Sequence, residues 1–296
     1  MTGLGLRPYT AGDDPAPASV PVSVIVLTLD EEMNIRRCLD SVAWADQVVV
    51  IDSGSADGTA AIAYGWGADV VEQPWLGFSA QREFALRLPL LRHDWVYFVD
   101  ADEWVCPQLA SEIAGWLPAP SCAAFSQRFR LVFQGTWIRH CGWYGGSWIV
   151  RLVDRRYTKF DGSPVGERAC VDGPVQRLRH DIVDEDRKDL AAWLHKHVRY
   201  AELEAARRGE QAGRPGKRRA PRSRGDSRPM IRSVLKEVVF PAIPARPAAL
   251  FGYMYIVRLG LLDGRAGLRF CFFHAWYEVC VNALHARAAA AERETI

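Results

Sequence analysis

Cysteines at metal-ligand spacing are missing from this chain of 296 residues. Its seven cysteines are scattered along the sequence, without a Cys-x-x-Cys pair. This pattern argues against zinc-finger and thioredoxin-like sites. Scattered single cysteines are typical of small apolar residues in a reducing compartment, so we expect a cytoplasmic protein.

Long apolar runs are absent too. A membrane-spanning helix needs roughly 18 consecutive apolar residues, and the nearest run, residues 248–262, is shorter and contains Arg258. Near the N-terminus, Asp13, Asp14 and several prolines stand where a secretory signal peptide would need a continuous apolar stretch. We therefore expect residues 1–20 to be a flexible leader.

An excess of either charge is missing as well. The 37 Lys and Arg residues nearly balance the 35 Asp and Glu residues, and the formal charge of +2 gives no reason to expect a nucleic-acid partner. The distribution is uneven, because residues 207–232 contain ten basic and two acidic residues, a local charge of +8. With its prolines and glycines, this stretch predicts a solvated basic linker or arm over residues 205–230.

The dinucleotide-binding fingerprint Gly-x-Gly-x-x-Gly is also absent, which argues against a nicotinamide-dependent oxidoreductase. The first hundred residues instead alternate apolar strands with amphipathic helices. Strands are expected at residues 22–27, 47–51, 69–71 and 95–99, with a helix between each pair. This alternation predicts an α/β fold, a mostly parallel sheet with helices on both faces, in a domain of residues 21–200.

Two aspartates follow the last of these strands. Ligands of parallel sheets bind at the carboxyl ends of the strands, and Asp100 and Asp102 lie at such an end. Residues i and i+2 of an extended chain point the same way, so the two carboxylates can face one hard cation. Such a cation would stabilise the charge of a departing nucleotide diphosphate. The alternative is a loop in which acids follow a strand by chance, because this spacing is common.

A second acidic loop, residues 52–59, follows the second expected strand. Asp52 can accept a hydrogen bond from a base N–H, and the glycines of the loop let the backbone approach a ligand closely. The alternative is an ordinary helix-capping turn, which Asp57 alone would satisfy.

Three segments in chain order resemble the inverting family 2 glycosyltransferases of the GT-A fold, and among these the bacterial lipopolysaccharide-core β-glucosyltransferase-like proteins. They are residues 23–32 (SVIVLTLDEE), 50–59 (VIDSGSADGT) and 98–103 (FVDADE). The resemblance implies a Rossmann-like GT-A domain. It also implies transfer of a hexose from a nucleotide sugar, with a UDP-sugar as the expected donor, to a glycan or lipid-linked acceptor in cell-envelope polysaccharide or lipopolysaccharide synthesis.

The resemblance also assigns roles to individual residues. It places Thr28, Asp30 and Asp52 around the nucleoside, and Asp100 and Asp102 around Mg²⁺ or Mn²⁺, with Asp102 acting in catalysis. Arg82 matches a basic position near the diphosphate, and its alternative is a solvated helix face. The family more often has Asn-Glu where this chain has Asp30-Glu31, which leaves the hydrogen bonds at that position open.

Inversion needs a base that takes the proton of the acceptor hydroxyl on the face opposite the leaving group. Glu167 is the candidate, because Val165-Gly166-Glu167 resembles the position of a carboxylate in this subset. Glu103 and Asp161 are its rivals. His180 could complete the metal shell or touch phosphate, although a lone histidine is more often structural.

The C-terminal region, residues 231–290, is expected to be helical. Residues 248–262 and 270–284 are apolar and aromatic, and could lie in a membrane interface beside the basic arm, which would be attracted to anionic lipid. The protein would then be peripheral on the inner face of the plasma membrane. The alternative is a pair of helices packed on the catalytic domain.

Two other functions stay open. The same fold serves polyprenyl-phosphate glycosyltransferases that resemble dolichyl-phosphate mannose synthase. A non-catalytic sugar-nucleotide-binding protein is the third possibility, and the intact Asp100–Asp102 pair argues against it.

Overall fold

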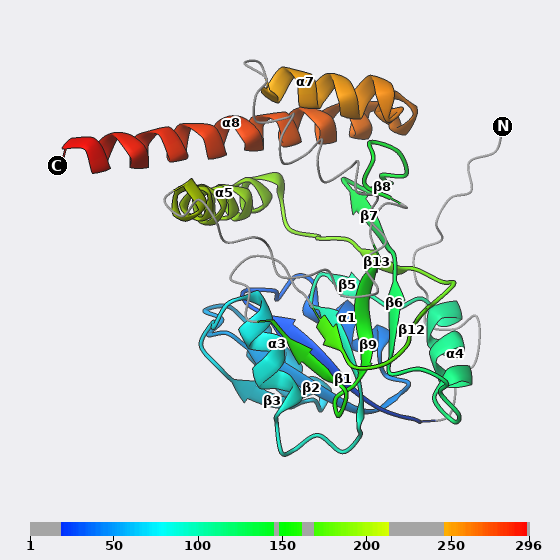
Figure 1. Cartoon of the computed structure of the whole chain (residues 1–296). Helices are drawn as coiled ribbons and strands as arrows, with labels where there is room; N and C mark the ends of the chain where they lie inside the picture. Colours follow the sequence, from blue (N-terminus) through cyan, green and yellow to red (C-terminus); the bar gives the residue numbers. More distant parts are fainter. Residues whose placement is uncertain (1–18, 145–147, 162–168, 213–245, 295–296) are drawn as a thin grey trace.

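A mixed seven-stranded sheet lies at the centre of the computed structural model (Figure 1), which describes residues 19–144, 148–161, 169–212 and 246–294. The strand order is β12-β6-β9-β4-β1-β2-β3. Four neighbouring strands, β4, β1, β2 and β3, are parallel. The predicted α/β class with a mostly parallel sheet is therefore confirmed.

The parallel half comes from the first hundred residues, as the alternation predicts. Its elements are β1 (Val20–Thr28), α1 (Ile35–Ser41), β2 (Ala45–Asp52), α2 (Thr59–Trp66), β3 (Asp69–Glu72), α3 (Phe78–Leu86) and β4 (Trp95–Asp100). Because consecutive parallel strands need a crossover connection, each helix carries the chain back across a face of the sheet.

The other half of the sheet is mixed. Strand β9 (Ile149–Asp154) runs antiparallel to both β4 and β6 (Ala124–Gln127), and β12 (Val175–Arg177) runs parallel to β6. Helix α4 (Pro107–Trp116) connects the two halves. Its first residue is a proline, which suits the first turn because no intrahelical hydrogen bond needs that N–H.

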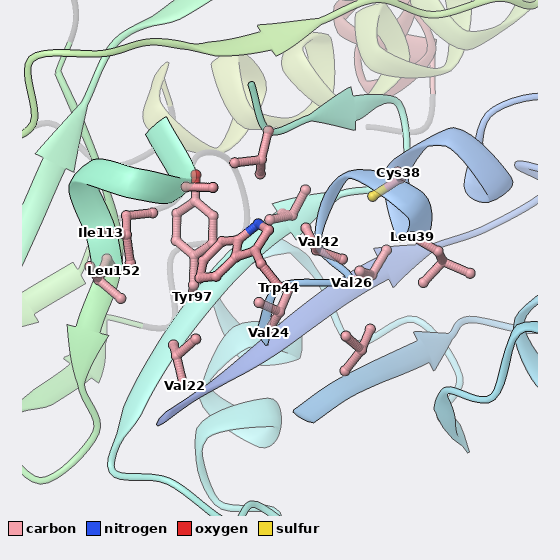
Figure 2. Close-up of a cluster of buried hydrophobic side chains, with 14 of the residues drawn as sticks. Val22, Val24, Val26, Cys38, Leu39, Val42, Trp44, Tyr97, Ile113 and Leu152 are labelled. Atoms are coloured by element: carbon pink, nitrogen blue, oxygen red, sulfur yellow. The ribbon is translucent and has the colours of Figure 1, made fainter. Parts of the chain in front are cut away.

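The core lies on both faces of the sheet, which explains why β1 is apolar at nearly every position. Val22, Val24 and Val26 pack on one face with α1 and α4, as Figure 2 shows, while Ile25 and Leu27 pack on the other face with α3. Full burial of each such side chain stabilises the fold by roughly 1.5–3 kcal/mol. A strand with one solvated face would instead alternate between apolar and polar residues.

A second sheet of four short strands has the order β5-β13-β7-β8. Its strands are β5 (Glu103–Trp104), β7 (Phe129–Phe133), β8 (Thr136–Trp137) and β13 (Ile182–Asp184), and a separate hairpin consists of β10 (Thr158–Phe160) and β11 (Ala169–Val171). Because β5 begins at the residue after Asp102 and pairs with β13, this sheet brings Asp184 next to the carboxyl end of β4.

The C-terminal helices form a layer on top of the second sheet (Figure 1). They are α5 (Leu190–Ala212), α7 (Arg246–Gly252), the π-helix η3 (Tyr253–Val257), the 3₁₀-helix η4 (Gly260–Asp263) and α8 (Gly264–Glu294). Helix α8 packs on both α5 and α7, and Phe270 and Cys271 of α8 form an apolar cluster with Phe133 of β7. The inner side of these helices therefore packs on the body of the protein.

The apolar stretch 248–262 is not one helix, contrary to the sequence expectation. It divides into α7, η3 and η4, with Leu259 in the left-handed region at φ 59°. Among the described residues, no helix has the length and apolarity that crossing a bilayer requires. The basic linker predicted at residues 205–230 lies mostly outside the described residues, while its first part belongs to α5.

Candidate active site

Three acidic loops lie together at the carboxyl ends of β1, β2 and β4. The parallel register sets Thr28 opposite Asp52 and Leu27 opposite Asp100, so the ends of the three strands are level. The loops that follow them are the segments singled out from the sequence. Their convergence follows from the parallel topology, which collects the ends of neighbouring strands at one edge.

Asp52 is buried and organises its own loop. Its carboxylate accepts hydrogen bonds from the backbone N–H groups of Gly54 at 3.2 Å and Ser55 at 2.9 Å. Gly54 has φ +95°, a conformation that a residue with a Cβ rarely adopts. The loop after β2 is thus a turn that Asp52 holds by its own hydrogen bonds, rather than only the cap of the next helix.

Asp30 joins the first loop to the second. Its backbone N–H donates to Ser55 Oγ at 2.9 Å, and its carboxylate accepts from the N–H of Ala56 at 2.8 Å. Beside it, the hydroxyl oxygen of Thr28 is buried and has no hydrogen-bond partner within the described part of the chain. A buried hydroxyl without a partner is costly, and a ligand that bonds to it would remove that cost.

Asp100 lies between two buried arginines. One of its carboxylate oxygens is 2.8 Å from Arg82 of α3, and the other is 2.8 Å from Arg151 of β9. Burial opposes the charge on Asp100, but the two guanidinium groups outweigh it and hold the pKa of this carboxyl well below its usual value. The side chain of Arg82 is only 2% exposed, so the solvated helix face considered for it is wrong.

Sequence reasoning missed Arg151. It also contacts Glu103 at 3.0 Å and is the one charged residue before the last position of β9. The sequence signal for it is an isolated arginine inside an otherwise apolar strand. Because arginine is rarely buried unless it is paired, such a residue predicts a buried ion pair.

Asp102 has a different partner. Its carboxylate lies 2.9 Å from the ammonium of Lys196, which α5 supplies, and that ammonium is 3.8 Å from Asp186. Nearby, burial and the charge of Asp102 raise the pKa of Asp184 to about 8. Burial opposes the charge of Lys196 as well, but Asp102 outweighs it and raises the pKa of this lysine.

Acidic groups outnumber basic groups around this site. The carboxyl groups are those of Glu31, Asp100, Asp102, Glu103, Asp184 and Asp186, and the cations are Arg82, Arg151, Lys188 and Lys196. Burial first, and then the charge of these neighbouring carboxylates, raise the pKa of Asp184. A divalent cation would relieve the repulsion among these carboxylates, so the side chains present suit a metal ion. Among the described residues, no three metal-ligand side chains already converge on one point.

Asn34 ties the segment before α5 to the first acidic loop. Its amide donates to Glu31 at 2.7 Å and to Asp186 at 2.9 Å, and its oxygen accepts from the backbone N–H of Arg187 at 2.9 Å. Lys188 completes the group with an ion pair to Glu31 at 2.7 Å. These contacts, which span about 150 residues of sequence, fix where α5 begins relative to the site.

The candidate for the general base lies outside the described residues, because these omit 162–168 and therefore Glu167. Its rivals both have protein partners. Glu103 is buried, with one oxygen on Arg151 and the other accepting the N–H of Asp100 at 2.8 Å, while Asp161 accepts from the hydroxyl of Ser79 at 3.3 Å.

His180 is bound to a carboxylate of helix α4. Its imidazole Nδ1 lies 2.8 Å from a carboxylate oxygen of Glu112 in α4, which also accepts the backbone N–H of His180. This contact is of the kind expected for a structural histidine.

A mostly parallel sheet with an Asp-x-Asp pair at the end of β4 and acidic loops beside it agrees with the GT-A fold that the sequence resemblance implies. Residues 23–165 match the family model described as glycosyl transferase family 2. This part of the chain is therefore a family 2 glycosyltransferase domain, and the resemblance stated from the sequence is confirmed.

Two curated relatives show what this domain is similar to. An uncharacterized glycosyltransferase of Rickettsia bellii (strain RML369-C) is 41% identical over 93 residues, which cover 31% of this chain and 31% of that protein. The lipopolysaccharide core biosynthesis glycosyltransferase LpsC of Rhizobium meliloti (strain 1021) is 33% identical over 112 residues, which cover 33% of this chain and 41% of that protein. The matches thus span less than half of the length of these relatives.

Among solved structures, the chain is similar to glucosyl-3-phosphoglycerate synthase from Mycobacterium tuberculosis in complex with Mn²⁺, UDP and glucosyl-3-phosphoglycerate. It is 26% identical, with 38% of this chain and 44% of that chain covered and a TM-score of 0.33.

Proposed function

We propose that this chain is an inverting, metal-dependent glycosyltransferase that moves a hexose from a nucleotide sugar, with a UDP-sugar as the expected donor, to an envelope glycan or a lipid-linked acceptor. The observation that carries the proposal is the Asp100–Asp102 pair at the end of β4, surrounded by Arg82, Arg151 and Lys196. The family 2 domain supports the reaction class. The similarity to LpsC supports an acceptor in lipopolysaccharide synthesis.

The nucleoside is expected to bind over the ends of β1 and β2. Asp30 and Asp52 hold the two loops there in a fixed shape, because each of them accepts hydrogen bonds from backbone N–H groups. Thr28, the last residue of β1, is proposed to take part as well, and its buried hydroxyl has no hydrogen-bond partner in the described part of the chain. Loops that are held in one shape before binding lose little conformational entropy when they bind a ligand.

The metal ion, Mg²⁺ or Mn²⁺, would be held by Asp100 and Asp102. Such an ion acts as a Lewis acid that stabilises the negative charge of the leaving nucleotide diphosphate. Arg82 and Arg151 keep the carboxylate of Asp100 in one orientation, and Arg82 adds positive charge beside the expected position of the diphosphate. Asp102, with a single lysine on one oxygen, retains a free lone pair for an ion.

Glu167 stays the proposed general base. In this role its carboxylate takes the proton from the acceptor hydroxyl as that oxygen attacks the anomeric carbon from the face opposite the diphosphate. The proton transfer raises the nucleophilicity of the hydroxyl in the transition state, where the new bond forms as the bond to the diphosphate breaks.

A peripheral position on the inner face of the plasma membrane is part of the proposal. Eight large apolar side chains of the C-terminal layer are between 43% and 67% exposed, namely Ile256, Val257, Leu259, Leu261, Leu262, Leu268, Phe272 and Val279. Large apolar side chains that gather exposed on neighbouring elements are typical of an interaction surface. Insertion into the interface of a bilayer would cover it and bring the site to a lipid-linked acceptor.

The alternative acceptor is a polyprenyl phosphate, which the same apolar layer would also suit. The product separates the two, because a glycan acceptor yields a glycoside whereas a lipid phosphate yields a sugar phosphodiester. A non-catalytic sugar-nucleotide-binding protein would bind the donor and form neither product.

The experiment that tests the proposal is a donor screen. UDP-sugars and GDP-sugars are incubated with the protein, and release of the nucleotide diphosphate is measured with Mn²⁺ and with EDTA. We expect slow, Mn²⁺-dependent release from one donor, because water replaces the acceptor. Metal-dependent binding of a nucleotide sugar without turnover on any glycan or lipid acceptor would favour the non-catalytic function.

A further inference from the structure

Lys196 reaches the site from an element that none of the sequence motifs includes. Its ammonium is 2.9 Å from Asp102 and 3.8 Å from Asp186, and its side chain is 32% exposed. The lysine comes from α5, 94 residues along the chain from Asp102. It is thus an extra cation at the carboxylate that is expected to bind the metal.

Contacts on two sides hold α5 in place, so Lys196 is not a loosely placed surface lysine. The segment before the helix is bound to Asn34 through Asp186 at 2.9 Å. Further along α5, the imidazole of His197 stacks on Trp193 with ring centroids 3.5 Å apart, and Trp193 packs on Phe273 of α8. The helix therefore presents Lys196 to the site in a defined direction.

The two aspartates of the pair differ in what a metal ion would have to displace. Asp100 is held by two arginines whose side chains are 2% and 6% exposed. Asp102 is held by one lysine, which is a compact charge on a flexible stem. An ion that binds Asp102 repels the ammonium on the same carboxylate, and the flexible lysine is the partner that can move. Phosphate oxygens are the natural new acceptors for its N–H groups.

We propose that Lys196 is a diphosphate-binding residue that exchanges partners. In the empty site its ammonium neutralises Asp102. When a divalent ion and the donor bind, the ammonium leaves Asp102 and donates to a phosphate oxygen, where it stabilises the charge of the leaving diphosphate. The inference rests on the proposed function, because it takes the ligand to be a nucleotide diphosphate.

The first test measures binding of Mn²⁺ alone by electron paramagnetic resonance. In Lys196→Gln the ion no longer competes with the ammonium, so we expect Mn²⁺ affinity to rise about tenfold, because the removed charge lies within a few Å of the ion. The matched control is Arg199→Gln, which removes the same charge from an exposed position of the same helix. We expect its Mn²⁺ affinity to equal that of the wild type.

The second test measures UDP binding by calorimetry at saturating Mn²⁺. Here Lys196→Gln should bind UDP about tenfold more weakly, because a charge-assisted hydrogen bond to phosphate is lost. Lys196→Arg should retain most of the affinity, because arginine keeps the charge and the donors. Arg199→Gln should again match the wild type.

Opposite changes in the two affinities identify partner exchange. If Lys196 only supported the structure, Lys196→Gln would lower both the Mn²⁺ affinity and the UDP affinity. That result would overturn the proposal, and so would an unchanged Mn²⁺ affinity in Lys196→Gln. If the wild-type protein itself fails to bind UDP with Mn²⁺, the expected UDP donor is wrong. The Mn²⁺ titration then still decides whether Lys196 competes for Asp102.

Discussion

At the scale of single residues, the two aspartates of one motif have different surroundings. Asp100 is enclosed by Arg82 and Arg151, whereas the one ion pair of Asp102 within the described residues is with Lys196. A buried guanidinium that loses its carboxylate is left with an uncompensated charge, which destabilises the folded state. Asp100 therefore contributes to stability as well as to the site, and Asp102 contributes mainly to function.

This difference predicts unequal losses of stability for two equivalent substitutions. In EDTA, Asp100→Asn should lower the free energy of unfolding by about 2 kcal/mol, below the full cost of breaking a buried pair because Arg151 keeps Glu103. Asp102→Asn should lower it by less, because the flexible, partly exposed Lys196 that loses its partner lies 3.8 Å from Asp186 and can turn to it. Urea denaturation of both variants measures this, and equal losses would contradict the account.

The pH dependence of stability should report the crowding of carboxylates. The pKa of Asp184 is about 8 in the folded protein and near its ordinary value in the unfolded chain. As pH rises from about 4 to about 8, the unfolded state gives up this proton while the folded state keeps it, so stability falls across that window. Asp184→Asn removes this loss.

The measurement is urea denaturation of the wild type and Asp184→Asn in EDTA at pH 5 and pH 8.5. The variant should gain stability relative to the wild type at the higher pH. A difference between the two proteins that is the same at both pH values would show that Asp184 titrates normally.

The sequence predicts those site residues that follow a strand directly, because strand ends are visible as the limits of apolar runs. Asp52, Asp100 and Asp102 are of this kind. Arg151 and Lys196 are not, since they meet their partners 51 and 94 residues away along the chain, and only the tertiary fold sets such contacts.

At the scale of elements, the C-terminal layer contains a glycine, Gly260, whose backbone packs closely against its neighbours. A Cβ on Gly260 would lie 2.8 Å from the sulfur of Cys141 and 2.9 Å from the carbonyl oxygen of Met254. No real Cβ tolerates such contacts without a shift of the neighbouring chain. This tight packing lies at the first residue of η4, directly after the break at Leu259 that divides the single helix expected for residues 248–262.

We predict that Gly260→Ala destabilises the protein by about 1–3 kcal/mol, the usual cost of overpacking a well-filled core. Gly252→Ala is the matched control, because its Cβ would meet nothing within 4 Å and its φ of −58° suits alanine. Thermal unfolding compares the two. A neutral Gly260→Ala would mean that the turn between η3 and η4 is loose.

The parallel strands and their helices could be predicted because each has its own period of apolar residues. The break at residue 259 could not be predicted in that way. It lies next to Gly260, which packs closely against Cys141 in another part of the fold, and local composition carries no record of such contacts.

At the scale of the whole molecule, one layer carries both a link to the site and a surface of exposed apolar residues. Helix α5 presents Lys196 to Asp102 and packs on α8, and α8 exposes Phe272 and Val279. Together α7 and α8 also line an apolar groove of about 410 Å³, with Phe251 and Trp276 among its walls. The sequence left two alternatives for the C-terminal helices, which were a position in a membrane interface and packing on the catalytic domain. In the structure their inner side packs on the domain and their outer side exposes apolar residues.

Binding to a membrane can be measured by co-sedimentation with anionic vesicles. We expect a salt-sensitive component from the basic arm and a salt-resistant component from the apolar surface. The double substitution Val257→Ser and Phe272→Ser should reduce the salt-resistant component about tenfold or more, because each buried apolar side chain contributes on the order of 1.5–3 kcal/mol.

The control is Tyr157→Ser, which replaces an exposed aromatic residue on the catalytic domain and should leave vesicle binding unchanged. For the salt-sensitive component, the arm residues Lys217, Arg218, Arg219, Arg222 and Arg224 are neutralised together. Wild-type protein that stays wholly in the supernatant at low salt would contradict the membrane proposal.

The central claim is that Asp102 serves metal-dependent transfer from a nucleotide sugar, and its most direct test is the rate of nucleotide diphosphate release from the active donor. The account predicts that Asp102→Asn lowers the Mn²⁺-dependent rate by about 10³-fold or more while the fold persists. Asp46→Asn, an exposed carboxylate in the first residues of β2, should match the wild type. Release by Asp102→Asn at a near wild-type rate, or wild-type release that EDTA does not reduce, would contradict the account.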